Sequence, residues 1–294
     1  MKKKLIRLTE NDLHNIVNYS AKKVLTEYYG VFNGCENKAI EILSKIRSLW
    51  KSNDADECQD FSVECDFCET KKLFITATKL KLRGAYLLDK KWVNGLDVIL
   101  INPNILYDDD NYIIKTLVHE LTHAYEDYQR KLKGSSLLDY AKQTNYANAR
   151  KWFLNGGDED NEMKDEIAEI MRYLSTFEVN ASLAALNSLV MRPWGGKKFN
   201  TVNDVLLYIY DTREYNRLMG YANTARLYAE TKDEEEMDDI LEALNELCDN
   251  KFRTKEQARH YFMVLCNRTE RQVEKLIPKL VNAYFEKQRE NSQE

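Results

Sequence analysis

Two histidines and a glutamate stand close together in the run from His119 to His123, which reads His-Glu-Leu-Thr-His. On a helix, residues four apart lie about 40° apart around the axis and one turn above each other. Both imidazoles can therefore reach one metal ion, while Glu120, about 100° from His119, can reach a water molecule beside that ion. This spacing predicts a hydrolytic metal site with Glu120 as general base.

The same helix has a plainer interpretation. His119 and His123 lie opposite its apolar face, so they could belong to the solvated side of an ordinary amphipathic helix. The apolar face consists of Ile114, Leu117, Val118, Leu121, Tyr125 and Tyr128. A third metal ligand elsewhere in the chain would decide between these two interpretations.

Glu178 is the best candidate for the third ligand. The pattern predicts one long helix from Glu162 to Met191, and Glu178 falls inside its apolar stripe. The stripe consists of Ile167, Met171, Leu174, Ala181 and Ala185. A buried carboxylate without a partner is unfavourable, and a metal ion would be such a partner. The alternative is a core glutamate bonded to other protein groups. Glu166 and Glu169 are weaker candidates because they lie on or near the polar side of the helix.

Two imidazoles and one carboxylate leave the fourth position of a tetrahedral ion open. That is the pattern of catalytic zinc sites, whereas structural sites are closed by four protein ligands. We therefore expect Zn²⁺, although other divalent ions could occupy such a ligand set.

These residues resemble those of the zincin metallopeptidases, in the gluzincin arrangement. The resemblance rests on the HExxH run and on a downstream E-x-x-A, here Glu178 to Ala181, 55 residues after His123. The segment from Glu178 to Met191, which ends before Pro193, is loosely similar to the ImmA/IrrE type. The resemblance implies a zincin-like fold and peptide-bond hydrolysis in a protein or peptide substrate. It also implies that the strand from Leu96 to Ile101 lies along the substrate. From the residues alone, that strand could equally be central and buried.

Zincins often carry a further histidine or tyrosine that stabilises the oxyanion. The candidates are His260, Tyr261, Tyr208, Tyr210 and Tyr215, with His260 and Tyr210 preferred. Groups that orient the metal ligands are also expected. Asp127, one turn after His123, and Ser182, one turn after Glu178, are placed to do this.

The elements around these residues predict an α+β fold. The runs Leu73–Thr78 and Val98–Ile101 predict strands, separated by turns at Gly84 and at Asn94-Gly95. The acidic cluster 108–110 predicts a helix start, after which nearly all of the pattern is helical. We expect a small mixed sheet packed on helices in the N-terminal half and a mostly helical C-terminal half. Two lobes follow, 1–133 with the HExxH helix and 134–294 with the third ligand.

Composition excludes several classes of protein. The 294 residues carry a net charge of −5 with scattered basic residues, so a nucleic-acid partner is not expected. The start lacks a Sec signal and no apolar run suits a membrane span, which predicts a cytoplasmic protein. Cys65 and Cys68 have CxxC spacing without a second pair, which favours reduced, packed cysteines.

The opening segment from Lys4 to Val17 predicts an amphipathic helix. It is similar to N-termini that recur in proteins of tailed phages, including crAss-like phages. That resemblance implies a docking helix, with phage particle components as partners and the host cytoplasm or the particle as location. It supports an alternative function, a phage particle or cargo protein that uses a zincin fold as a scaffold. The other interpretation of the segment is ordinary packing.

Overall fold

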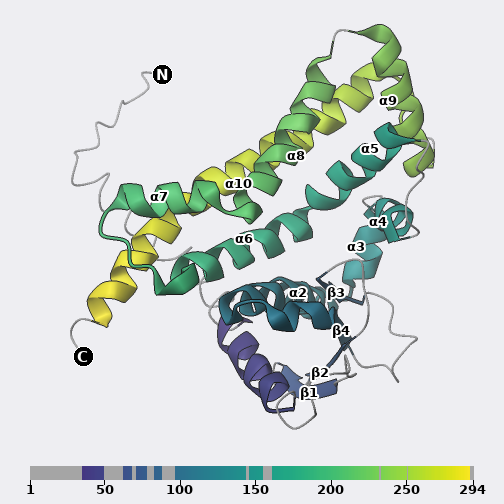
Figure 1. Ribbon diagram of the computed structural model, residues 1–294. Coiled ribbons are helices and arrows are strands. Elements are labelled where there is room, and N and C mark those ends of the chain that lie inside the picture. The colour runs from purple at the N-terminus through teal and green to yellow at the C-terminus, as the bar shows by residue number, and fades with distance from the viewer. Residues whose placement is uncertain are drawn as a thin grey trace, which may run out of the picture.

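The computed structural model of the chain describes residues 35–49, 62–67, 71–77, 83–87, 97–143, 146–154, 161–231, 233–249 and 251–291. Figure 1 shows a small sheet and helix α2 (Asp110–Leu132) on one side, and a stack of long helices on the other. The N-terminal half thus holds a mixed four-stranded sheet, and the C-terminal half is mostly helical. This confirms the predicted α+β class at the level of architecture.

The sheet has the strand order β1-β2-β4-β3. Its strands are β1 (Ser62–Phe67), β2 (Lys71–Ala77), β3 (Gly84–Tyr86) and β4 (Asp97–Ile101). β2 and β4 are parallel, whereas β1 pairs antiparallel with β2 and β3 pairs antiparallel with β4.

Strand β4 therefore has a neighbour on each side, and the expectation that Leu96 to Ile101 lies along a substrate is wrong. Its residues are nearly all buried, as in a central strand covered on both faces. The edge strand is β3, which begins at Gly84, where we had expected a turn. The turn expected at Asn94-Gly95 lies outside the described residues.

Helix α2 begins as predicted, because the Asp109 side chain caps it by accepting from the Asn111 amide. The plainer interpretation of α2, in which the histidines belong to a solvated side of the helix, is wrong. Lys115, Thr116 and His123 are each 6% exposed, because α6 (Thr176–Met191) packs against this side. The histidines therefore lie between two helices.

The predicted helix from Glu162 to Met191 is two helices, α5 (Glu162–Tyr173) and α6, separated by a break at Leu174 and Ser175. Ser175 has an extended backbone (φ −62°, ψ 148°) and occupies the N-cap of α6. Serine favours that position, but the apolar stripe continues across the break and conceals it. Glu178 consequently stands in the first turn of a helix.

The remaining described elements are helices, two before α2 and the others after it. They are a helix over 35–49, η2 (Pro103–Tyr107), α3 (Leu137–Gln143), α4 (Tyr146–Leu154), η3 (Trp194–Gly196), α7 (Val202–Asp211), α8 (Arg213–Glu230), α9 (Glu234–Leu247) and α10 (Lys255–Glu290). Buried apolar residues form two clusters, one around the sheet, α2 and α6, the other around α5 and α9. Both α8 and α10 contribute to each cluster, so these two helices join them.

Several expectations are not decided by this architecture. The lobe boundary at 133/134, the phage partners and the cellular location stay predictions. The segment from Lys4 to Val17 and the side chains of Cys65 and Cys68 lie outside the described residues, while Cys35, Cys248 and Cys266 are buried. In the described residues, no helix combines the length and apolar character needed to cross a membrane.

Candidate metal centre

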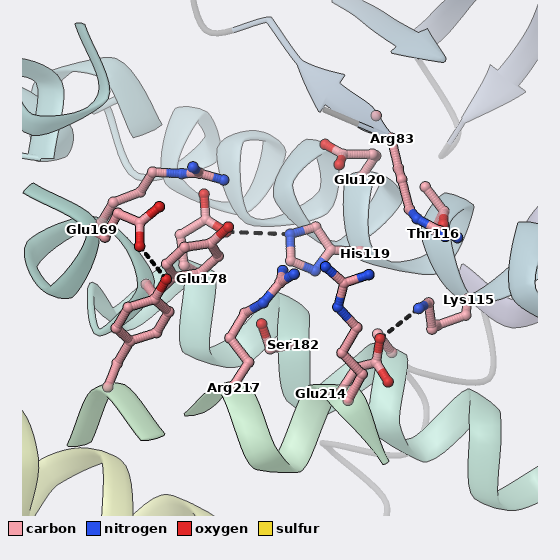
Figure 2. A pocket seen from close by; sticks show the side chains of 16 residues that line it. Arg83, Lys115, Thr116, His119, Glu120, Glu169, Glu178, Ser182, Glu214 and Arg217 are labelled. Atoms are coloured by element: carbon pink, nitrogen blue, oxygen red, sulfur yellow. Dashed lines mark hydrogen bonds and ion pairs between the residues drawn. The ribbon is translucent and has the colours of Figure 1, made fainter. Parts of the chain in front are cut away.

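Helices α2 and α6 bring His119, His123 and Glu178 together, and we call these three residues the metal triad. The Oε2 atom of Glu178 lies 3.2 Å from Nε2 of His119 and 3.6 Å from Nε2 of His123. The two Nε2 atoms are 3.3 Å apart. Figure 2 shows His119 and Glu178 facing each other across the wall of a pocket. The predicted third ligand is therefore where a metal site requires it.

The three distances fit a tetrahedral ion. Zinc binds nitrogen and carboxylate oxygen at about 2.0–2.2 Å, so adjacent ligand atoms of a regular tetrahedron are about 3.3–3.6 Å apart. The observed separations of 3.2, 3.3 and 3.6 Å match that edge length. An ion placed between the three atoms would need no rearrangement of the backbone.

Charge and burial also suit a cation. The side chains of His123 and Glu178 are each 7% exposed, and that of His119 is 24% exposed. Burial would raise the pKa of Glu178, but the two histidines outweigh it and hold that pKa well below its usual range. Burial would lower the pKa of His123, yet Glu178 raises it overall. The carboxylate is thus ionised and lies in a pocket open to solvent on the His119 side.

Glu120 is held next to the metal triad by strand β3. Its Oε2 accepts from the Tyr86 amide at 2.7 Å, and its side chain is buried. Gly84 permits this contact, because a Cβ there would lie 3.1 Å from Cγ of Glu120 and 3.2 Å from its Oε1. The close approach of β3 therefore fixes the position of the predicted general base.

Asp127, which we expected to orient the His123 ring, forms its hydrogen bonds with other groups. Asp127 accepts from the Tyr86 hydroxyl (2.8 Å), the Leu137 amide (2.9 Å) and Lys131, and those contacts hold its pKa below the usual value against the effect of burial. Asp127 therefore links α2 to β3 and does not orient the imidazole of His123.

Glu126 is a better candidate than Asp127 to orient the ring of His123. Its Oε1 accepts from the Asn180 amide group of α6 at 2.6 Å, and its charge contributes to the raised pKa of His123. Both Oε2 of Glu126 and Nδ1 of His123 are buried and have no hydrogen-bond partner among the described residues.

Two members of the metal triad, His119 and Glu178, line a cleft of about 490 Å³. Side chains from α2, α5, α6 and α8 line it, together with Arg83 and Gly84 at the start of β3. Ser182, expected near Glu178, is among them, and Glu120 is as well. The cleft is large enough for a short peptide segment beside the metal triad.

The predicted oxyanion residues are not brought to this cleft. His260 is exposed on α10, and Tyr210 is 43% exposed on α7 with its ring against Tyr215. Tyr208 packs on Phe199, and Tyr261 packs in the second apolar cluster. The spacing of these residues along the chain carried no information on which side of their helices faces the cleft.

Of the weaker ligand candidates, Glu169 lines the cleft and Glu166 does not. Glu169 accepts from the hydroxyl of Tyr221, and Glu166 accepts from that of Tyr228. Neither belongs to the group of described residues that could hold an ion. Glu178 is therefore the only one of the three acids that the described structure places with the histidines.

Sequence reasoning did not assign much of the cleft wall, including Tyr173 on α5 and Arg213, Arg217 and Tyr221 on α8. Positions 213, 217 and 221 are spaced by four, so they lie along one face of a helix. That spacing was visible in the sequence, but nothing in it showed that this face turns toward the HExxH helix.

Comparisons with known proteins give no family for this chain. The chemistry of the metal triad is therefore inferred from its own residues. No protein-family model, no curated protein and no solved structure matches the chain.

Proposed function

We propose that this protein is a zinc-dependent metallopeptidase with a zincin-like site. The observation that carries the proposal is the metal triad, whose three donor atoms lie 3.2–3.6 Å apart and of which His119 and Glu178 line a cleft of about 490 Å³. Two imidazoles and one carboxylate are the ligand set of catalytic zinc sites and leave one position open. The adjacent Glu120 completes the requirements for hydrolysis.

The chemistry that zinc supplies in such a site is that of a Lewis acid, which acidifies a water molecule and polarises a carbonyl oxygen. Glu120 takes the proton of the attacking water and passes it to the leaving amine. Because the Tyr86 amide occupies Oε2 of Glu120 (2.7 Å), Oε1 is the oxygen that accepts this proton. His119, His123 and Glu178 would hold the ion, and of the two histidines His119 is the one that lines the cleft.

The edge strand β3 supports a peptide as the substrate. The Leu87 amide donates to the Val98 carbonyl of β4 (2.9 Å), so the alternation of an antiparallel pair turns the backbone groups of Gly84 and Tyr86 away from β4. Gly84 lines the cleft. Its backbone groups are positioned to pair with an extended peptide that lies beside the metal triad.

Metal content is the first test. We expect purified wild-type protein to contain about one zinc per chain, and both Glu178→Ala and His123→Ala to lose it. Inductively coupled plasma mass spectrometry gives the ratio. Glu166→Ala is a matched control, because that carboxylate bonds Tyr228 outside the cleft and its loss leaves the metal triad intact.

Catalysis is tested on the zinc-loaded protein with a mixture of peptides analysed by mass spectrometry. We expect Glu120→Gln to keep its zinc and to lose cleavage by a factor of about 100 or more. If Glu178→Ala retains its zinc, a residue other than Glu178 is the third ligand. A wild-type protein without zinc, even after remetallation, would contradict the proposed hydrolase.

A further inference from the structure

The cleft beside the metal triad is lined by more basic side chains than carboxylates, and one of the basic residues, Arg83, pairs with Asp108 at 2.8 Å outside the cleft lining. Five basic residues line it: Arg83, Lys115, Arg172, Arg213 and Arg217. Four glutamates line it as well, and all have partners on the protein. Glu120 accepts from the Tyr86 amide, Glu169 from the Tyr221 hydroxyl, Glu178 contacts the histidines, and Glu214 pairs with Lys115.

Arg213 and Arg217 stand apart from these pairs. They are one turn apart on α8, and in the described part of the chain neither forms an ion pair with a carboxylate. Figure 2 shows Arg217 reaching from α8 toward His119. Both arginines lie on the wall of the cleft opposite the HExxH helix.

Arg217 is held in position by its neighbours. Its guanidinium lies 4.9 Å from the centre of the Tyr173 ring, which in turn stacks on Tyr221 at 4.7 Å. It also lies close enough to Lys115 to add to the effect of burial in lowering the pKa of that amine. Like charges are thus crowded here, and an anion in the cleft would relieve the repulsion.

We propose that Arg213 and Arg217 form a subsite for a carboxylate of the peptide substrate. The inference rests on the proposed peptidase function and adds a substrate class to it. A guanidinium binds a carboxylate through two parallel hydrogen bonds, and a second guanidinium one helical turn away can share the same group. A zinc ion nearby strengthens the attraction of the cleft for anions. The carboxylate belongs either to an acidic side chain or to the C-terminus of the peptide.

Binding of matched peptides tests the proposal without requiring cleavage. The protein is zinc-loaded full-length Glu120→Gln, and metal-free wild type is measured in parallel. The probes are acetyl-pentaalanine amides with one Glu or one Gln at each position in turn, and acetyl-pentaalanine with a free or an amidated C-terminus. Fluorescence anisotropy of labelled peptides gives each dissociation constant.

We expect at least one carboxylate peptide to bind about tenfold more tightly than its amide partner. Arg217→Gln and Arg213→Gln, each introduced into both proteins, should remove most of that preference. Arg226→Gln is the matched control, because Arg226 lies on the same helix but pairs with Glu270 outside the cleft. The Glu and Gln series identifies an acidic side chain as the ligand, and the C-terminal pair identifies the α-carboxylate.

The outcomes separate the two proposals. If the protein binds zinc and cleaves peptides but binds each acid peptide and its amide partner equally tightly, the carboxylate subsite alone is overturned. The subsite is also overturned if the preference for the acid peptide survives in both Arg213→Gln and Arg217→Gln. If wild type binds no zinc, the peptidase proposal fails, and the preference in metal-free protein still decides the subsite. Absence of binding by every probe overturns the subsite.

Discussion

At the scale of single residues, the sequence allows Glu178 two roles, as a helix cap or as a partner of the histidines. Ser175-x-x-Glu178 has the pattern of a capping box, in which the glutamate bonds back to the N-cap backbone. Ser175 makes no side-chain cap bond here, and Glu178 turns toward the histidines. Its place in the first turn of α6 also puts a negative charge near the positive end of the helix dipole.

A residue-scale prediction concerns Glu126. A metal-binding histidine usually donates its second ring nitrogen to an acceptor, and Oε2 of Glu126 is buried with unused capacity near His123. We expect Glu126→Gln to weaken zinc affinity about tenfold or more. Competition with a chelating dye measures the dissociation constant.

The neighbouring carboxylate provides the control for that experiment. Asp127→Asn changes the same helix one residue later, but Asp127 bonds Tyr86 and Leu137 instead of the imidazole. It should lower stability and leave the zinc dissociation constant near the wild-type value. If Glu126→Gln and wild type bind zinc equally tightly, Glu126 is not the acceptor that supports His123.

At the scale of elements, the contact between β3 and α2 is the most sensitive to a small change. Gly84→Ala places a methyl group 3.1 Å from Cγ of Glu120 and 3.3 Å from Cγ2 of Thr116. We expect overpacking of about 1–3 kcal/mol and a displaced Glu120. Turnover should fall while the zinc content stays at the wild-type value, which separates the base from the metal triad.

A second glycine makes the comparison specific. Gly220 lies inside α8, where an added Cβ meets no atom within 4 Å among the described residues. Gly220→Ala should raise stability by about 0.4–1 kcal/mol in urea unfolding, because alanine favours helix. Equal turnover in Gly84→Ala and wild type would show that β3 does not position the base.

The site was more predictable from the sequence than the elements around it. The HExxH spacing and the place of Glu178 in an apolar stripe depend on helical periodicity, which is local information. The pairing of β4 depends on distant strands, so its short and mainly apolar sequence suited an edge or a central strand equally well. The sequence did not reveal the break at Ser175, because the apolar residues keep the same helical spacing before and after it. The orientation of Arg217 depends on how α8 packs.

At the scale of the whole molecule, two apolar clusters share the same long helices. Phe262 of α10 is fully buried in the cluster around α9, whereas Val273 of the same helix is buried in the cluster around α2. A helix is cooperative along its length, so loosening one cluster transmits to the other. We therefore expect one unfolding transition for both clusters.

Hydrogen exchange tests this expectation. Phe262→Ala should lower global stability by about 3–5 kcal/mol through the cavity it leaves. Protection should fall by the same amount in the slowest amides of α2 and of α9. Leu227→Ala on α8, where the side chain is 67% exposed, should change both by less than about 0.5 kcal/mol. Loss of protection in α9 alone would show that the clusters unfold separately.

The two hydrogen bonds on the outer edge of β3 have a consequence for solubility. Glu120 accepts from the Tyr86 amide (2.7 Å), and Arg150 donates to the Tyr86 carbonyl (3.1 Å). An open sheet edge invites the strands of other molecules to add to it, and these side chains occupy the edge at Tyr86 while Gly84 still faces the cleft. Replacing Glu120 by alanine would remove an acceptor from this edge and promote self-association, whereas glutamine keeps one. Inactive protein for crystallisation should therefore carry Glu120→Gln.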